Sequence, residues 1–402
     1  MVASIAGAAR HTVSPYLCTL TAFAMYSTIP FNKPYLSGHE TRYIEEAVRS
    51  GKISGDGVFT KRCHAYFEQQ MGFAKALLTT SCTDALELAA LLLDIQPGDE
   101  VIMPSYTFVS TPNAFALRGA KIVFADSSSD NPNLDATALE SLVTHRTRVI
   151  VPVHYAGIAC DMDVIQEVAD RHGITVVEDA AQAIDSFYKG RRLGSIGALA
   201  AFSFHETKNI ISGEGGMLAI NDARYAARAE IIREKGTNRS SFFRGEVDKY
   251  GWVEVGSSFL PSDIIAAFLW AQLENLTDIQ QQRRAIWERY RDAFDSLLAI
   301  GITLPFVPDF ATNNSHMFYL VGRNLDERTA LIEHLKKLHI LPVFHYLSLH
   351  TSPFYANKHD GRPLLNADHY TDCLVRLPLY YELSTDEQQR VIDGVLNFYH
   401  SR

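Results

Sequence analysis

The chain has 402 residues, 47% of them hydrophobic and 21% charged, which is typical of a soluble globular protein with material for two to three domains. A formal net charge of −9 without any basic tract argues against nucleic-acid binding. No stretch approaches the roughly 18 apolar residues of a membrane span. The five cysteines are widely spaced and form no CxxC pair, so we expect a cytoplasmic protein with reduced thiols and no metal site.

The first 28 residues have a different texture from the rest. The segment 17–26 is apolar but interrupted by polar residues, and Arg10 is the one basic side chain before it. A secretory signal peptide has a stronger basic start and a small-residue cleavage site. We therefore expect residues 1–28 to be a poorly ordered extension, and the patterned domain to begin near Ile29.

Between residues 29 and 255, short apolar runs alternate with amphipathic segments, which predicts an α/β domain with a mainly parallel sheet covered on both faces. Ligands of such sheets bind beyond the carboxyl ends of the strands. The predicted strands are Ala76–Thr79, Glu100–Met103, Lys121–Phe124, Arg148–His154, Thr175–Glu178, Leu199–Phe204 and Met217–Ile220. The predicted helices between them are Thr83–Leu93, Asn113–Leu117 and Asp163–His172.

From residue 256 to 402 the pattern predicts a smaller α+β domain packed tightly against the first. Its predicted elements are a long broken helix Pro261–Arg291, a strand His316–Val321, a helix Glu327–Leu338, a strand Ile340–Phe344 and a final helix from about Thr385. We find no internal repeat and no low-complexity linker.

A candidate phosphate site lies at the junction of a strand and a helix, in residues 79–86, where hydroxyl side chains crowd around Cys82 and Thr83. A helix N-terminus offers unpaired N–H groups and partial positive charge to a phosphate. Ser203, at the end of a later strand, is a further donor. Taken alone, these residues are better explained as helix caps, the usual role of Ser and Thr at helix starts.

Asp179 follows a buried strand and is the candidate partner of a pyridine nitrogen. A carboxylate there holds the ring proton through a charge-assisted hydrogen bond, and the charged ring then accepts carbanion density. Gln182, three residues on, is placed to reach the ring hydroxyl. An acid after a strand also commonly caps the next turn.

Lys208 lies in a loop after another strand and runs into Gly213-Glu214-Gly215-Gly216. A lysine at one strand end and an acid at another together favour pyridoxal 5′-phosphate chemistry, in which the amine holds the cofactor as a Schiff base. Burial beside a cationic ring lowers the pKa of such an amine, which can then move a proton in the reaction. A single loop lysine is ordinarily solvated, so the hypothesis depends on the joint arrangement.

Weaker candidates surround these three. Phe108 follows a strand and is a candidate to stack on the cofactor ring, although aromatics there are more often core. His345, Tyr346 and His350 fall around a strand end in the second domain and are candidates for substrate binding. Arg239 is a candidate for contacting a diphosphate, and a solvated face explains it equally well.

Taken together, the ordered motifs resemble the DegT/DnrJ/EryC1/StrS family of pyridoxal-phosphate sugar aminotransferases, over nearly all residues from Ile29 onward. The motifs are Ser81-Cys82-Thr83-Asp84-Ala85-Leu86, Glu178-Asp179-Ala180-Ala181-Gln182, Ser203-Phe204-His205-Glu206-Thr207-Lys208-Asn209 and Gly213-Glu214-Gly215-Gly216. The resemblance implies fold type I, like aspartate aminotransferase, and a homodimer with active sites at the subunit interface.

The resemblance also implies roles for the individual residues. Lys208 would carry the cofactor and Asp179 would pair with its ring nitrogen, while Gln182 would lie near the ring hydroxyl and Phe108 would stack on the ring. Cys82, Thr83 and Ser203 would hold the phosphate. A lysine at position 208 indicates the aminotransferase branch, because the related sugar 3-dehydratases have histidine there.

Two positions depart from the family pattern. Cys82 replaces a common glycine, and a non-glycine residue holds that turn when its φ stays negative. The family motif Gly-Tyr-Asn-Tyr-Arg is replaced by Gly256-Ser257-Ser258-Phe259-Leu260. In relatives the asparagine reaches the partner's phosphate, so the resemblance assigns that cross-subunit contact to the shorter Ser258.

Further segments, 29–34, 235–239 and 256–262, are similar to a subgroup acting in enterobacterial common-antigen synthesis. The resemblance implies a transaminase that converts dTDP-4-dehydro-6-deoxy-D-glucose to dTDP-4-amino-4,6-dideoxy-D-galactose with L-glutamate as donor and 2-oxoglutarate as product. Alternatives are another sugar-nucleotide aminotransferase, acting at C3 or giving the other C4 epimer, a dehydratase, and a noncatalytic regulatory protein of the same fold. A nicotinamide dehydrogenase is disfavoured, because no G-x-G-x-x-G opens an early βαβ unit.

Overall fold

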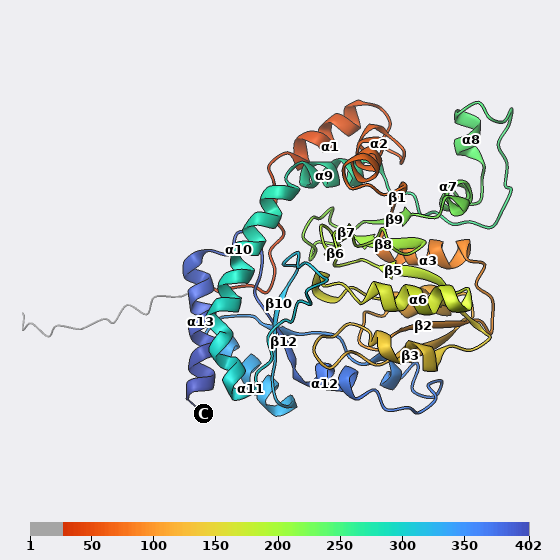
Figure 1. Ribbon diagram of the computed structural model, residues 1–402. Coiled ribbons are helices and arrows are strands. Elements are labelled where there is room, and N and C mark those ends of the chain that lie inside the picture. Colours follow the sequence, from red (N-terminus) through yellow and green to blue (C-terminus); the bar gives the residue numbers. More distant parts are fainter. Residues whose placement is uncertain (1–26, 402) are drawn as a thin grey trace, which may run out of the picture.

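The structure, a computed structural model, describes residues 27–401. The predicted extension therefore lies outside the described residues except for its last two positions. A large sheet with helices on both faces forms one part of the molecule, and a small sheet with long helices forms the other (Figure 1).

Within the described chain, the large sheet has seven strands in the order β1-β9-β8-β5-β4-β2-β3. Neighbours from β8 through β5, β4 and β2 to β3 are parallel, whereas β9 runs antiparallel to both β1 and β8. The strands are β1 (Lys75–Thr79), β2 (Glu100–Pro104), β3 (Lys121–Ala125), β4 (Thr147–Ile150), β5 (Thr175–Asp179), β8 (Leu199–Ser203) and β9 (Gly216–Ile220). The prediction of a mainly parallel α/β sheet is confirmed.

Alternate strand residues enter two separate hydrophobic cores, as the two-residue period of a strand requires. Ala76 and Leu78 face one core and Leu77 faces the other. The helices of this part are α1 (Glu40–Arg49), α2 (Val58–Ala65), α3 (Cys82–Leu92), α4 (Ser110–Ala116), α5 (Leu139–Leu142), α6 (Met162–His172), α7 (Ala226–Arg233) and α8 (Arg239–Phe243). Helices α5 and α6 cover the first face, and α3, α4 and α7 cover the second. The short strands β6 (Phe187–Tyr188) and β7 (Arg191–Arg192) form a separate hairpin.

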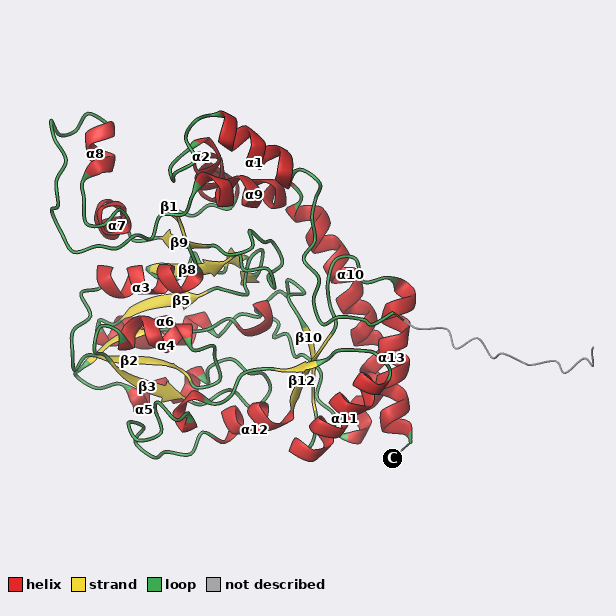
Figure 2. Cartoon of the chain, turned by 180° about the vertical axis from the view of Figure 1, so that it is seen from behind, coloured by secondary structure: helices red, strands yellow, loops and turns green. Residues whose placement is uncertain are grey.

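The smaller part is built on a three-stranded antiparallel sheet in the order β10-β12-β11. Its strands are β10 (Phe318–Val321), β11 (Val343–Phe344) and β12 (Leu374–Leu377). Its helices are α10 (Leu276–Phe294), α11 (Leu325–Lys337), α12 (Leu365–Cys373) and α13 (Thr385–His400). Figure 2 shows α10, α11 and α13 side by side at the outer edge of this part. Near the start of the described chain, Ile29 is fully buried and pairs with Ile340, so this segment belongs to the small sheet's core.

Helix α9 (Asp263–Glu274) links the two parts. It packs on α1 and α2, and its apolar side chains belong to the first core of the large sheet. The buried carboxylate of Asp263 accepts hydrogen bonds from the Phe59 and Thr60 N–H groups and from the Thr60 hydroxyl, which ties α9 to the start of α2. The division at residue 256 stays a prediction, and the packing shows that the chain after it still contributes to the first core.

Several local expectations differ from the structure. The strand predicted to reach His154 ends at Ile150, two residues before Pro152, which lacks the N–H that a ladder needs. The break predicted in the long helix is confirmed and lies at Asn275, between α9 and α10. Helices α1 and α2 and strand β12 were not predicted. Helix α1 does have a helical pattern, since Tyr43 and Ala47 are buried four residues apart, whereas β12 has only four residues, too few for a period to show.

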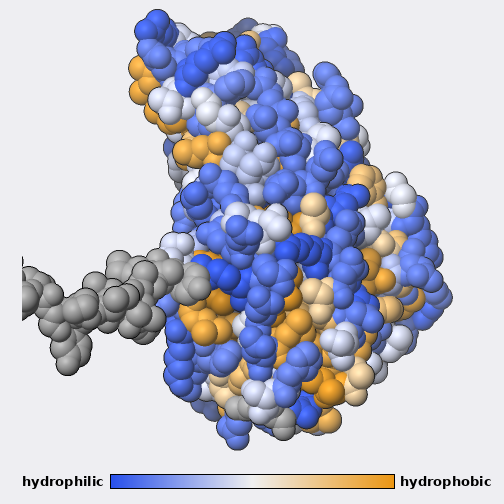
Figure 3. All heavy atoms as spheres, turned by 90° about the vertical axis from the view of Figure 1, so that its left-hand side faces the viewer, coloured by the Kyte–Doolittle hydropathy of each residue, from blue (hydrophilic) through white to orange (hydrophobic). Residues whose placement is uncertain are grey.

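In the part of the chain that the structure describes, no helix combines the length and apolarity that crossing a membrane requires. The face seen in Figure 3, on the side of α10 and α13, is mainly hydrophilic with small hydrophobic groups between polar side chains. Isolated apolar groups of this kind are normal on a protein surface.

Candidate active site

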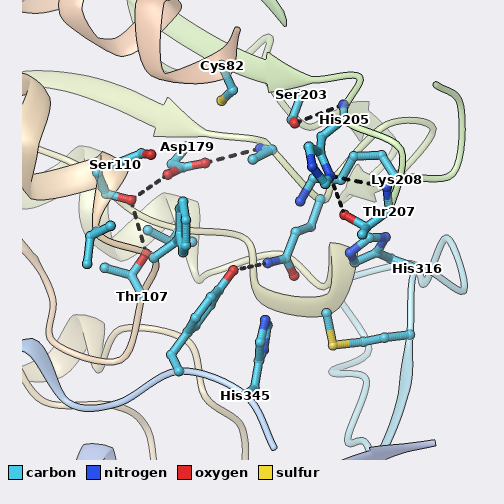
Figure 4. Close-up of a pocket in the computed structure, with 18 of the residues that line it drawn as sticks. Cys82, Thr107, Ser110, Asp179, Ser203, His205, Thr207, Lys208, His316 and His345 are labelled. Atoms are coloured by element: carbon cyan, nitrogen blue, oxygen red, sulfur yellow. Dashed lines mark hydrogen bonds between the residues drawn. The ribbon is translucent and has the colours of Figure 1, made fainter. Parts of the chain in front are cut away.

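A pocket of about 790 Å³ lies between the carboxyl ends of the large sheet's strands and the small domain. Figure 4 shows Cys82, Asp179, Lys208, His316 and His345 surrounding one common space. Other lining residues are Phe31, Asn32, Ser81, Thr83, Thr107, Phe108, Ser110, Thr111, Gln182, Ser203, His205, Phe344, Tyr346 and Arg376. The position agrees with the rule that parallel sheets bind ligands beyond their strand ends.

The first wall of the pocket contains the N-terminus of α3. Ser81 caps this helix, since its hydroxyl accepts the Asp84 N–H at 3.0 Å. The backbone N–H groups of Cys82 and Thr83 have no protein acceptor among the described residues. Gly216 lies against the Ser81–Cys82 peptide so closely that a Cβ there would overlap it. This leaves two free donors and a helix dipole facing the pocket, which is the setting for a phosphate.

Asp179, the last residue of β5, is buried with its carboxylate in the pocket. One oxygen accepts the Thr111 hydroxyl at 2.7 Å and the other accepts the Ala181 N–H at 3.1 Å. Burial raises the pKa of Asp179, and these two hydrogen bonds together with the charge of Lys208 only partly offset it. The carboxylate has no salt-bridge partner within residues 27–401, so it is suited to a cationic N–H from a ligand.

Glu178, one residue earlier in β5, faces the opposite side of the sheet and is fully buried. Its carboxylate accepts N–H groups of Gly194, Ile196 and Gly197, each at 2.7 Å, and the His154 Nε2–H at 3.0 Å. Burial alone raises the pKa of Glu178, but the hydrogen bonds from His154 and the backbone outweigh it, and the net pKa is lowered. This carboxylate anchors the strand that carries Asp179.

Lys208 follows β8 and extends into the same pocket. Its Nζ makes no hydrogen bond or ion pair with any other described residue, so the amine is available to react. Burial lowers the pKa of Lys208, against the opposing effect of Cys82 and Asp179. A lower pKa leaves more of the amine unprotonated and nucleophilic near neutral pH.

Gln182 is held from both ends of its amide. Its oxygen accepts the Ala156 N–H at 2.7 Å, and its nitrogen donates to the Tyr346 hydroxyl at 2.9 Å. The Tyr346 ring stacks on His345 with 3.6 Å between ring centroids, and the Tyr155 hydroxyl contacts the His345 Nδ1 at 2.6 Å. Burial lowers the pKa of His345 well below its usual range, so this wall presents neutral hydrogen-bonding groups.

The remaining predicted residues fall into two groups. Ser203, at the end of β8, and Phe108, which is 56% exposed, line the pocket. His350, Arg239 and Ser258 do not line it. The His350 ring is buried, and its Nδ1 lies 2.8 Å from the Ser105 hydroxyl. This hydrogen bond gives the buried imidazole the partner that it needs, outside the pocket.

The pocket residues that were not predicted include Thr111, His316 and Arg376. The Asn209 amide nitrogen already donates to Gln280 and to the Asn314 carbonyl, so its oxygen accepts the His316 Nδ1–H at 2.8 Å. The His316 Nε2 therefore carries a lone pair. Burial, and then the charge of Lys208, lower the pKa of His316 well below its usual range. Thr111 and Arg376 lie at a helix start and in a four-residue strand, where the sequence has no motif to mark them.

These features fit pyridoxal phosphate. Within the described chain, the α3 N-terminus has free N–H donors for a phosphate, and Lys208 has an amine without a hydrogen bond. Asp179 has a buried carboxylate that accepts two hydrogen bonds but forms no salt bridge with any described residue, so it can pair with a ring nitrogen. All three face one pocket that has room for more than the cofactor. Among residues 27–401 no group of three or more His, Cys, Asp or Glu side chains is arranged to hold a metal ion.

Comparisons with known proteins agree with this fit. A profile of the DegT/DnrJ/EryC1/StrS aminotransferase family matches residues 34–396. The spore coat polysaccharide biosynthesis protein SpsC of Bacillus subtilis (strain 168) is 36% identical over 379 residues, covering 91% of this chain and 96% of SpsC.

Solved structures are also similar. The aminotransferase TlmJ from Streptoalloteichus hindustanus has a TM-score of 0.86 and 29% identity, with 93% of this chain and 100% of TlmJ covered. Spr1654 from Streptococcus pneumoniae, solved in its PLP-form, has a TM-score of 0.84 and 28% identity, with 93% of this chain and 99% of that one covered. DesV from S. venezuelae has a TM-score of 0.84 and 31% identity, with 94% and 100% covered.

Proposed function

Because this chain belongs to the DegT/DnrJ/EryC1/StrS aminotransferase family and is a pyridoxal-phosphate-dependent sugar aminotransferase, we propose a specific substrate pair for it. The proposed reaction moves an amino group from L-glutamate to C4 of dTDP-4-dehydro-6-deoxy-D-glucose. The products are 2-oxoglutarate and dTDP-4-amino-4,6-dideoxy-D-galactose, which serves polysaccharide synthesis. We propose this particular sugar because residues 29–34, 235–239 and 256–262 resemble one subgroup of the family.

The observation that carries the aminotransferase mechanism is the placement of Lys208 and Asp179 in one pocket. When bound, pyridoxal phosphate supplies a carbonyl carbon that condenses with amines and a ring that accepts electron density. The N–H groups of Cys82 and Thr83 bind its phosphate, with Ser203 as a further donor. The Asp179 carboxylate holds the proton on the ring nitrogen.

Lys208 has two successive tasks in the proposed reaction. Its Nζ would hold the cofactor as a Schiff base, and the same amine, once an incoming amine has displaced it, would be the base that takes up and returns the proton of the substrate carbon. The lowered pKa of Lys208 suits both tasks. Glutamate leaves as 2-oxoglutarate before the sugar nucleotide enters, so the same Nζ serves both halves of a ping-pong sequence.

The other wall orients the bound groups. The Gln182 amide holds the Tyr346 hydroxyl, and Gln182 would lie near the ring hydroxyl of the cofactor. Phe108 is exposed at the pocket surface, with its ring centroid 6.0 Å from that of Tyr346. A cofactor ring that stacks on Phe108 would cover this exposed aromatic surface.

We also propose a homodimer. Helix α8 and the loops around it extend away from the body of the molecule (Figure 1), and this arm carries Arg239. Phe243 is largely exposed and Trp252 is 81% exposed, which is apolar surface that a second copy of the chain would cover. Ser258 lies at the base of the arm, paired with Glu234, outside the pocket of its own chain. In the dimer, Arg239 and Ser258 would reach the partner's pocket.

A cytoplasmic location is part of the proposal. Cys63, Cys82, Cys160 and Cys373 are free thiols in the described chain. Reduced thiols are usual in a reducing compartment.

The test uses purified protein loaded with pyridoxal phosphate. L-glutamate should bleach the cofactor's absorbance, and borohydride treatment before glutamate should attach the cofactor to Lys208. Addition of dTDP-4-dehydro-6-deoxy-D-glucose should then restore the absorbance, and NMR should identify an axial C4 amine. An equatorial C4 amine or a C3 amine would replace the proposed sugar product while leaving the aminotransferase assignment intact.

A further inference from the structure

Arg376 lies in the middle of β12 and lines the pocket that contains Lys208. Its guanidinium lies over the Phe31 ring, 4.5 Å from the ring centroid, and one nitrogen donates to the Phe344 carbonyl at a long 3.4 Å. Its Nε is buried and has no hydrogen-bond partner. Among residues 27–401 no carboxylate forms a salt bridge with Arg376.

Two buried arginines show what the partly buried Arg376 lacks. Arg233 pairs with the Asp56 carboxylate at 2.7 Å and donates to the Leu78 carbonyl at 3.1 Å, although its Nε, like that of Arg376, has no partner. Arg283 donates to the carbonyls of Ser315 and His316, at 3.2 and 2.6 Å. Both bind protein acceptors through two nitrogens, whereas Arg376 has one long hydrogen bond within the described chain.

A partly buried cation without an anion is unfavourable, because burial removes part of its hydration and no carboxylate among the described residues replaces it. A cation–π contact compensates only part of that loss. Burial lowers the pKa of Arg376. The fork of unpaired N–H groups matches the two oxygens of a carboxylate.

We propose that Arg376 binds a carboxylate of the amino donor, and of the 2-oxo acid that the donor becomes. This inference rests on the proposed function, because it assigns a binding role within the same pocket. It makes β12 the element through which the small domain recognises a dicarboxylate.

Proximity to the reacting amine favours a carboxylate over a nucleotide diphosphate. Arg376 and Lys208 line the same pocket, and the charge of Arg376 also contributes to lowering the pKa of Lys208. In an α-amino acid the carboxylate is attached to the reacting carbon itself. In a nucleotide sugar the diphosphate is attached at C1, across the ring from a reacting C4. The cofactor's phosphate is also excluded as the partner, since its donors lie on α3 in the opposite wall.

The test compares Arg376→Gln, Arg376→Lys and a control, Arg328→Gln, in the full-length holoenzyme. Arg328 lies on α11 with its guanidinium 5.7 Å from the Phe344 ring centroid, donates to the Asp372 carbonyl, and does not line the pocket. The control therefore removes a positive charge near β11 from a residue that does not line the pocket.

Three readouts are measured. The first is the rate of cofactor absorbance change against L-glutamate concentration in single-turnover mixing. The second is the reverse change when the amino-loaded protein meets the keto-sugar nucleotide. The third is the shift in melting temperature caused by glutarate, a dicarboxylate that has no amine and cannot react.

Removing one partner of a buried charge pair should lower kcat/KM for glutamate by about a hundredfold in Arg376→Gln. Arg376→Lys should recover part of the loss, and Arg328→Gln should match the wild type. The sugar-nucleotide step should stay within about threefold of the wild type in all variants, since substitutions remote from a contact are usually near neutral. Glutarate should raise the melting temperature of the wild type and of Arg328→Gln, but not of Arg376→Gln.

Other outcomes would overturn the inference. Loss of the sugar-nucleotide step with an intact glutamate step would assign Arg376 to the diphosphate. Equal loss of both steps would make its role structural. Failure of glutarate to stabilise the wild type, or equal stabilisation of Arg376→Gln, would remove the carboxylate site. If the wild type binds glutarate and reacts with glutamate but aminates no sugar nucleotide, the proposed sugar substrate fails and the carboxylate site stands.

Discussion

The two walls of the pocket are built on different principles. The large-domain wall consists of strand ends and one helix N-terminus, and its groups are fixed by short hydrogen bonds, as Thr111 and Ala181 fix Asp179. The small-domain wall consists mainly of aromatic rings, such as Tyr346, and a cation, Arg376, with few acceptors. A wall with fixed donors suits a group that is always present, while stacked rings and an unpaired charge suit ligands that come and go.

This difference indicates that cofactor binding and substrate selection are assigned to different walls of one pocket. We expect the large domain to hold the group that performs the chemistry, and the small domain to supply the groups that select substrates. If this separation is correct, substitutions in the first wall should abolish the chemistry, and those in the second should alter substrate use.

The largest effect is expected for Lys208→Ala. Without the amine, the cofactor binds noncovalently and no group moves the proton, so turnover should fall by at least about 10⁴-fold. Stopped-flow absorbance with L-glutamate measures the loss. Near-normal transamination by this variant would refute the role of Lys208.

Asp179→Asn should come next. The amide has almost the same shape but cannot hold a proton on the ring nitrogen by charge, so kcat should fall by about 10²–10³, the usual loss for one preorganised electrostatic contact. Steady-state kinetics with saturating glutamate and sugar nucleotide check this. A change confined to KM would mean that Asp179 acts in substrate binding and not in the chemistry, which would contradict the proposed division between the two walls.

Glu178→Gln tests whether the first wall depends on its buried anchor. The amide nitrogen would face backbone N–H groups, so the free energy of unfolding at pH 7 should drop by about 2–4 kcal/mol. Because the folded-state pKa of Glu178 is lowered, its contribution is present above its unfolded pKa of about 4.3 and is lost as pH falls below that value. Urea unfolding should therefore show a large difference in unfolding free energy between the wild type and Glu178→Gln at pH 7, and a small difference near pH 3. An equal difference at both values would mean that the charge of Glu178 is unimportant.

The smallest effect is expected for Tyr346→Phe, in the second wall. The substitution removes the hydroxyl that Gln182 contacts and keeps the stacked ring, so kcat/KM should change by about two- to tenfold. Competition kinetics between sugar nucleotides would show whether selectivity changes with it. A loss comparable to that of Lys208→Ala would assign Tyr346 to the chemistry.

The sequence allowed the first wall to be predicted far better than the second. Lys208, Asp179 and Thr83 follow elements with clear periods, and strand ends in a parallel sheet converge at one edge. Arg376 lies in a strand of four residues followed by Pro378, which is too short for its period to be recognised. His350 had the residue type of a ligand, but its distance from the pocket is set by long-range packing against Ser105.

The small sheet has one further consequence, which concerns the order of synthesis. Every strand of the large sheet lies between residues 75 and 220, whereas β12 of the small sheet ends at residue 377. Ile29 pairs with Ile340, which lies just before β11. Chains emerge from the ribosome with the N-terminal end first. Lys208 and Asp179 are therefore translated well before the second wall, and the contact of Phe31 with Arg376 forms only after the residues between them have been translated.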